Sequence, residues 1–209
     1  MPERFVGFYW TLPVNWAGFR ELPVDVAAAA EASQTIRYQR ERVRQYVAAE
    51  HGELIDEIAF MDVRTDRATE IVETELKQRA SKYAGQAILV SVAFDEHHRW
   101  RHNPYLEAAA ESIGVELLPL SPDPIELDGR RFDPIAHFKK WRSRDEEEKD
   151  RLRFAATDGL RQALQQIPAK RGRWTEIASA LNSKSVRSIQ GNVWTAEGVR
   201  KLATRMAAP

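Results

Sequence analysis

The chain has 209 residues, of which 43% are hydrophobic and 30% are charged, with 31 basic and 31 acidic residues. This composition is typical of a globular protein with one ordinary core and a small additional module. No stretch approaches the roughly 18 apolar residues of a membrane-spanning helix, so no membrane association is expected. The absence of cysteine excludes disulfides, thiol catalysis and cysteine-bound zinc. Because the first residues also lack a secretory pattern, we expect a cytoplasmic location.

Strands alternate with helices over the first 120 residues. The apolar runs predict strands at residues 4–12, 54–61, 87–94 and 115–120. The intervening segments predict helices at residues 35–50, 69–83 and 105–113. This alternation predicts an α/β fold with a mostly parallel sheet flanked by helices. Chemistry in such sheets gathers where strands end, and these ends carry Leu12, Asp62 with Arg67, and Asp95 with Arg99.

The rest of the chain divides into a loop, a long helix and a terminal module. Residues 121–134 are rich in proline and aspartate and predict a loop at a domain edge. Residues 136–166 predict one long helix, which is solvated through i,i+4 ion pairs or serves as a dimer contact or a bridge. We therefore expect an α/β domain (1–134), a connecting and dimerisation helix (135–168) and a terminal module (169–209).

The net charge of zero conceals two parts of opposite sign. Residues 139–209 contain 16 Lys and Arg against 8 Asp and Glu, a net charge of +8. The preceding residues therefore carry −8. This asymmetry suggests that the carboxyl-terminal part faces a polyanion.

The sequence of the terminal module predicts a helix, a short β-wing and a second helix. Apolar residues repeat at helical spacing in two segments: Ile177, Ala178 and Leu181, then Val199, Leu202 and Met206. Between them, Gly191-Asn192 predicts a turn between two short extended pieces, and Thr195 predicts the N-cap of the second helix. Two short helices around a turn, the second of them basic, can place a helix in the DNA major groove. The alternative is a surface helical hairpin with ordinary solvated cations.

If this module binds duplex DNA, its polar side chains divide into two sets. The expected phosphate contacts are Lys170, Arg171, Arg173, Lys184 and Arg187. The candidate groove contacts are Thr195, Glu197, Arg200, Lys201 and Arg205. Phosphate contacts set affinity and position, whereas only contacts to base edges specify sequence.

The order of these parts resembles the serine recombinase family of resolvases and large serine integrases. The segment from Ile177-Ala178 through Leu181-Asn182 to Gly191 and Trp194-Thr195 is similar to the family's DNA-binding segment. Further similarities to family motifs are Arg153 with Gly159-Leu160, Thr35 to Gln39, Asp62 with Arg67, and Asp95 with Arg99. The resemblance implies a resolvase-like fold, a homodimer, a double-stranded DNA partner and no cofactor.

The departures from the family concern its catalytic residues. Leu12 stands where the family has its nucleophilic serine, Trp10 replaces an arginine of the same strand, and Glu96 replaces another arginine. Phosphoryl transfer needs a nucleophile and positive charge around the transition state. The resemblance therefore implies a pseudoenzyme that acts as a recombination accessory or regulator, with Asp62, Arg67, Asp95 and Arg99 as catalytic remnants.

Two other classes of function stay open. A divergent enzyme could use another hydroxyl for strand transfer, or could nick DNA with a metal held by Asp62, Asp95 and His98. The weak metal candidates are His98 and His102, which would share a helix face at i,i+4 spacing. Otherwise the α/β domain is a scaffold that binds a protein partner, and the basic tail is incidental.

Overall fold

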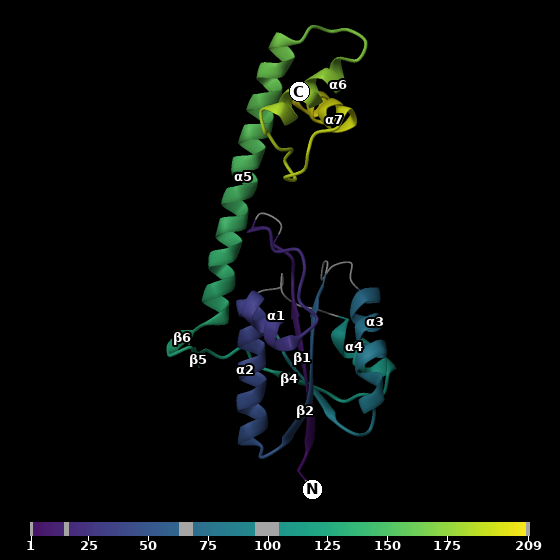
Figure 1. The fold of residues 1–209 in the computed structure, drawn as a ribbon, viewed down its shortest axis with the longest axis vertical. Helices are drawn as coiled ribbons and strands as arrows, with labels where there is room; N and C mark the ends of the chain where they lie inside the picture. The colour runs from purple at the N-terminus through teal and green to yellow at the C-terminus, as the bar shows by residue number, and fades with distance from the viewer. Residues whose placement is uncertain (1, 15–16, 63–68, 95–104, 208–209) are drawn as a thin grey trace. The chain divides into compact units, whose positions relative to one another are not determined.

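The chain forms two compact units, Met1–Phe138 and Lys139–Pro209, which can be followed in Figure 1. The structure is a computed structural model that describes residues 2–14, 17–62, 69–94 and 105–207, with the backbone alone at residues 69–73. Each unit has a hydrophobic core of its own. The first unit is α/β, as the alternation of strands and helices predicts.

Four parallel strands form the sheet of the first unit, in the order β2-β1-β3-β4. They are β1 (Arg4–Thr11), β2 (Glu53–Met61), β3 (Ile88–Val92) and β4 (Leu117–Leu120). β1 lies inside the sheet, and its residues from Phe5 to Thr11 are all buried, which explains its continuous apolar and aromatic sequence. The expected parallel sheet is therefore confirmed, with strands close to the predicted positions.

Helices cover both faces of this sheet. They are α1 (Val26–Ala32), α2 (Gln34–Ala49), α3 (Thr69–Arg79), the short 3-10 helix η2 (Ser81–Tyr83) and α4 (Leu106–Ser112). Figure 1 shows α1 and α2 on one face and α3 and α4 on the other. Ser33 separates α1 from α2, and its hydroxyl accepts a hydrogen bond from the Ile36 amide, so that a new helix begins there.

Both outer strands of the sheet are irregular. In β2, Leu54 and Asp56 pair with consecutive residues of β1, so Ile55 is an extra residue that bulges out of the ladder. In β4, the third residue is Pro119, which has no amide hydrogen to offer a further strand.

The expectation of a plain loop at residues 121–134 was wrong. Two short strands, β5 (Ile125–Leu127) and β6 (Arg130–Phe132), form an antiparallel hairpin there. The two turn residues, Asp128 and Gly129, have φ angles of 54° and 70°. Asp-Gly is a common pair in such two-residue turns because both positions need positive φ. The Asp-Gly dipeptide was therefore the signal that could have predicted the hairpin.

Three helices follow the hairpin: α5 (Pro134–Gln166), α6 (Arg173–Ser183) and α7 (Ala196–Ala207). The long helix and both terminal helices are confirmed. The predicted β-wing was wrong, because residues 184–195 contain a turn at Ser188–Asn192 but no strand. The first residues of α5, up to Phe138, belong to the first unit, and the rest of α5 belongs to the second.

Candidate nucleic-acid interface

The second unit is held together by a core shared among α5, α6 and α7. Ala156, Leu160 and Ala163 of α5 are buried with Ile177, Ala178 and Leu181 of α6 and Val199 of α7. Gly159 explains how α5 and α6 approach so closely. A methyl group at Gly159 would lie 3.2 Å from Leu181 Cδ2 and 3.2 Å from Val186 Cγ1. A side chain there would therefore require the Leu181 and Val186 side chains to shift by a few tenths of an ångström.

The amide side chain of Asn182 fixes the segment between α6 and α7. Its Oδ1 accepts a hydrogen bond of 2.8 Å from the Trp194 amide, and its Nδ2 donates one of 3.0 Å to the Trp194 carbonyl. The next residue, Thr195, caps α7, because its hydroxyl accepts a hydrogen bond from the Gly198 amide at 3.1 Å. The predicted N-cap is therefore confirmed. Asn182, Trp194 and Thr195 together set the position at which α7 begins.

The charges of α5 within this unit are largely neutralised inside the helix. Residues 139–166 contain 8 Lys and Arg against 6 Asp and Glu, a net charge of +2. Five of these basic residues form ion pairs at i,i+3 or i,i+4 spacing: Arg142–Glu146, Lys149–Asp145, Arg151–Glu148, Arg153–Asp150 and Arg161–Asp158. The charged middle of α5 is thus a solvated helix surface with little excess charge.

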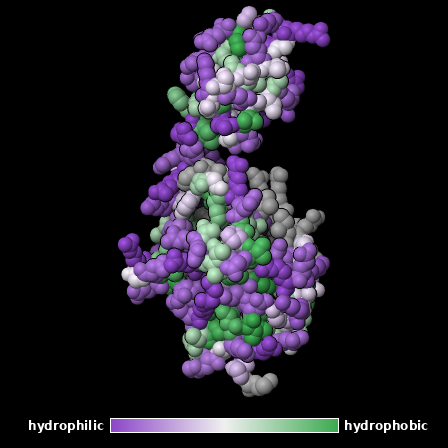
Figure 2. All heavy atoms as spheres, viewed as in Figure 1, coloured by the Kyte–Doolittle hydropathy of each residue, from purple (hydrophilic) through white to green (hydrophobic). Residues whose placement is uncertain are grey.

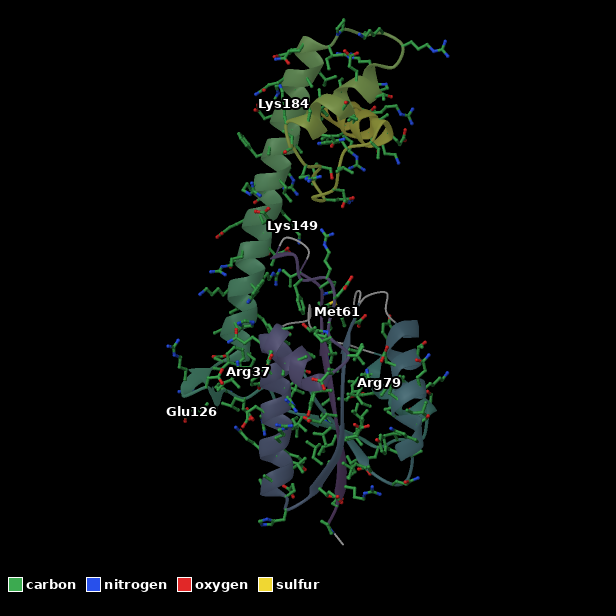
Figure 3. All side chains as sticks on the ribbon, viewed as in Figure 1. Arg37, Met61, Arg79, Glu126, Lys149 and Lys184 are labelled. Carbon is green, nitrogen blue, oxygen red and sulfur yellow. The ribbon has the colours of Figure 1, made fainter. Side chains whose placement is uncertain are left out.

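The positive charge of the unit is concentrated after α5. Residues 167–209 contain 8 Lys and Arg but only 2 Asp and Glu, a net charge of +6. Four of these cations are exposed and have no ion-pair partner within the described parts of the chain: Arg171, Lys184, Arg187 and Arg205. Figure 2 shows that hydrophilic residues predominate on the visible face of this unit. Figure 3 labels Lys184, just beyond the end of α6, and Lys149 on α5.

Two of the expected phosphate contacts have partners inside the unit. The Arg173 guanidinium donates a 2.7 Å hydrogen bond to the Leu164 carbonyl near the end of α5, and it lies over the Trp174 ring. Lys170 pairs with Glu176 at 2.8 Å. Arg173 therefore has a structural role in closing α5 against α6, while Lys170 is neutralised locally.

The solvent-facing side of α7 is polar from Glu197 to Arg205. It presents Glu197, Arg200, Lys201, Thr204 and Arg205, all exposed, while Val199 is buried on the opposite side. Glu197 accepts two hydrogen bonds from Arg200, of 3.1 and 2.9 Å, and lies 3.6 Å from the Lys201 ammonium. The hydrogen bonds from Arg200 lower the pKa of Glu197, which is therefore ionised at neutral pH. Two candidate groove cations are thus held by one carboxylate.

The carboxyl edge of the sheet is the other predicted site. Trp10 is buried with its ring packed edge-on against Phe94, and Leu12 packs against the core. Asp62 follows Met61, which Figure 3 labels at the end of β2; it is fully buried, and its amide donates to the Thr11 carbonyl at 2.9 Å. Apolar packing therefore fills the positions at which the resemblance places serine and arginine.

The other remnant and metal candidates cannot be placed. Arg67, Asp95, Glu96, Arg99, His98 and His102 lie outside the described residues. Within the described residues, no three His, Asp or Glu side chains are grouped so that they could hold a metal ion. The metal candidates therefore stay predictions from sequence.

Gln39 holds the end of β1 where that strand has parted from β3. The β1–β3 pairing ends at Gly7 and Val90, although β1 continues to Thr11 beside β2. The Gln39 side chain bonds to β1 where β3 no longer pairs with it. Its Nε2 donates to the Trp10 carbonyl at 2.7 Å, and its Oε1 accepts from the Trp10 amide at 3.3 Å. Gln39 is fully buried, so the segment from Thr35 to Gln39, which resembles a family motif, has a structural role in this chain.

We expect Gln39→Leu to destabilise the first unit without changing its volume much. The substitution leaves the buried amide and carbonyl of Trp10 without partners, at about 1–3 kcal/mol for each group. Urea unfolding of the whole chain, followed by the transition of the first unit, measures the loss. Gln45→Leu is the matched control, since Gln45 lies exposed on the same helix and should change the free energy of unfolding by about 0.5 kcal/mol or less. Equal losses in the two variants would exclude the role assigned to Gln39.

The structure contains a network of charged side chains between α2 and β2 that the sequence analysis did not predict. Glu57 accepts hydrogen bonds from Arg40, Arg44 and the Tyr9 hydroxyl, at 2.8–3.2 Å. Burial acts to raise the pKa of Glu57, but the hydrogen bonds from Arg40 and Arg44 outweigh it and keep the pKa below its ordinary value. Burial and the Glu57 carboxylate raise the pKa of Tyr9. Gly7 makes room for this arrangement, because a methyl group there would lie 2.1 Å from the Tyr9 hydroxyl.

Comparison of the chain with protein-family models, curated proteins and solved structures finds no match. Among the described residues, no helix is both long enough and apolar enough to cross a membrane.

Proposed function

We propose that the protein binds double-stranded DNA through the part of its second unit that follows α5. The observation that carries the proposal is the net charge of +6 on residues 167–209, with four exposed cations that have no ion-pair partner in the described structure. Each phosphate neutralised by such a cation releases counterions, which is the main source of affinity for duplex DNA. A unit with its own core can present these cations without unfolding.

The charges favour α7 over α6 as the helix that enters the groove. The exposed residues of α6 are Thr175, Glu176, Ser179 and Ser183, a set without a cation. The exposed side of α7 carries three, Arg200, Lys201 and Arg205. In this proposal α7 lies in the major groove, while Lys184, Arg187 and Arg171 contact phosphates beside it.

In the same proposal the first unit does not cleave DNA. The buried Trp10 and the partly buried Leu12 fill the end of β1 with apolar side chains, and neither can attack or stabilise a phosphate. The protein then acts at DNA as a recombination accessory factor or regulator, as a homodimer, with the first unit available to a protein partner. A covalent protein–DNA adduct in denaturing gels, or nicking of plasmid DNA by the pure protein, would contradict this part of the proposal.

A salt titration of binding to a mixed-sequence duplex tests the proposal. We expect the logarithm of the whole chain's affinity to fall linearly with the logarithm of salt concentration, with a slope of about −0.9 for each phosphate neutralised. Residues 1–138, which have their own core, should not bind. Failure of the whole chain to bind at about 50 mM salt, where electrostatic binding is strong, would refute DNA binding.

A further inference from the structure

Glu197 is the single acidic residue on the exposed side of α7. It lies in the first turn of the helix, with Arg200 one turn further along and Lys201 beside it. Residues 167–209 contain one other acidic residue, Glu176 of α6, which pairs with Lys170 in the segment between α5 and α6. A carboxylate on the side of α7 that faces DNA in this proposal needs an explanation, because it repels every phosphate it approaches.

The contacts of Glu197 restrict what α7 can do at a DNA backbone. Arg200 directs both Nε and Nη2 at the carboxylate, the two-point geometry with which arginine also grips phosphate. While Arg200 holds Glu197, its Nε–Nη2 edge is not available to a phosphate. Lys201, at 3.6 Å, is drawn to the same carboxylate. While Glu197 is charged, Arg200 and Lys201 are therefore weaker partners for DNA phosphates than unpaired cations are.

The edges of the bases carry hydrogen-bond donors for the Glu197 carboxylate, whereas the DNA backbone carries only negative charge. In the major groove cytosine presents its N4 amine, a donor that a carboxylate can accept, and guanine opposite presents two acceptors for arginine. An ionised Glu197 next to Arg200 therefore matches the two halves of a C·G pair. At other base pairs the carboxylate meets a poorer set of donors.

We propose that Glu197 determines the sequence preference of α7: it accepts a hydrogen bond from a cytosine amine in the major groove and, at sequences without that cytosine, keeps Arg200 and Lys201 away from the phosphates. The proposal rests on the DNA binding proposed above and adds the base that is read. It also separates two tasks. The unpaired cations supply affinity, and the two paired cations on α7, Arg200 and Lys201, supply discrimination.

The first test compares Glu197→Gln with Glu176→Gln in the full chain, on a mixed-sequence duplex. Both substitutions remove one negative charge from the first turn of a helix and free at least one lysine, so the general charge effect is matched. Glu197→Gln frees two cations, and we expect its salt slope to steepen by up to about 1.8, with about tenfold tighter binding or more near 0.1 M salt. Glu176→Gln should steepen the slope by about 0.9 at most. Equal changes in the two variants would overturn the inference.

The second test is selection from a duplex library with randomised positions. The natural chain and Glu176→Gln should both enrich cytosine at one position, whereas Glu197→Gln should lose that preference or exchange it for adenine, which glutamine reads through its N6 and N7. Unchanged enrichment in Glu197→Gln, or no cytosine enrichment in the natural chain, would overturn the inference while leaving DNA binding intact. Loss of binding by the natural chain itself would overturn both proposals.

Discussion

Replacing Arg171, Lys184, Arg187 and Arg205 together by alanine is expected to abolish most of the DNA affinity. Each of these side chains is exposed and unpaired in the described structure, so each is free to neutralise a phosphate. Loss of four contacts makes the salt slope shallower by about 3.6 and lowers affinity about a thousandfold near 0.1 M salt. Fluorescence anisotropy of a labelled duplex across a range of salt concentrations measures both quantities.

A second fourfold variant separates specific placement from overall charge. Arg142, Lys149, Arg151 and Arg153 of α5 all form ion pairs within their own helix, and their replacement by alanine removes the same number of positive charges. This control should lower affinity far less. A similar fall in both variants would mean that DNA binding follows net charge alone and has no defined surface.

Asn182→Ala is expected to unfold the segment that positions α7. Trp194 is 6% exposed, and both its backbone groups bond to the Asn182 side chain. Each group left without a partner costs about 1–3 kcal/mol, a large share of the stability of a small unit. Thermal unfolding of residues 139–209, followed by circular dichroism, measures the loss, and DNA affinity should fall with the folded fraction.

Two further asparagine variants sharpen the test. Asn192→Ala alters an exposed side chain in the same segment, and it should change the free energy of unfolding by about 0.5 kcal/mol or less. Asn182→Asp keeps the acceptor for the Trp194 amide but sets a second oxygen against the Trp194 carbonyl, so it should destabilise nearly as much as Asn182→Ala. A stable Asn182→Asp variant would contradict the assigned hydrogen-bond pattern.

The helices and the parallel sheet could be predicted because their signals are local. The spacing of Ile177, Ala178 and Leu181 fixes which side of α6 is buried, and the hydroxyl of Thr195 acts on an amide three residues away. The β-wing prediction failed because the backbone amide and carbonyl of Trp194 form hydrogen bonds with the Asn182 side chain and not with another strand. That contact spans twelve residues, and no periodicity encodes it.

The sequence also could not show which Lys and Arg side chains of the second unit form ion pairs and which are free, because some of their contacts depend on tertiary packing. Pairs within α5 follow from i,i+4 spacing, and so does the Lys201–Glu197 pair. The contact of Arg173 with the Leu164 carbonyl depends on how α6 packs against α5. The sequence therefore shows that the module is basic as a whole, but it could not show that the Arg173 guanidinium, one of the predicted phosphate contacts, bonds to the Leu164 carbonyl inside the unit.

The irregular outer strands have a consequence for the behaviour of the chain in solution. A regular edge strand offers unpaired backbone groups to any other extended chain, which leads to aggregation through sheet extension. Here the bulge at Ile55 and the proline at Pro119 interrupt the two edges of the four-stranded sheet. We therefore expect the first unit to resist polymerisation by added strands at both margins of its sheet.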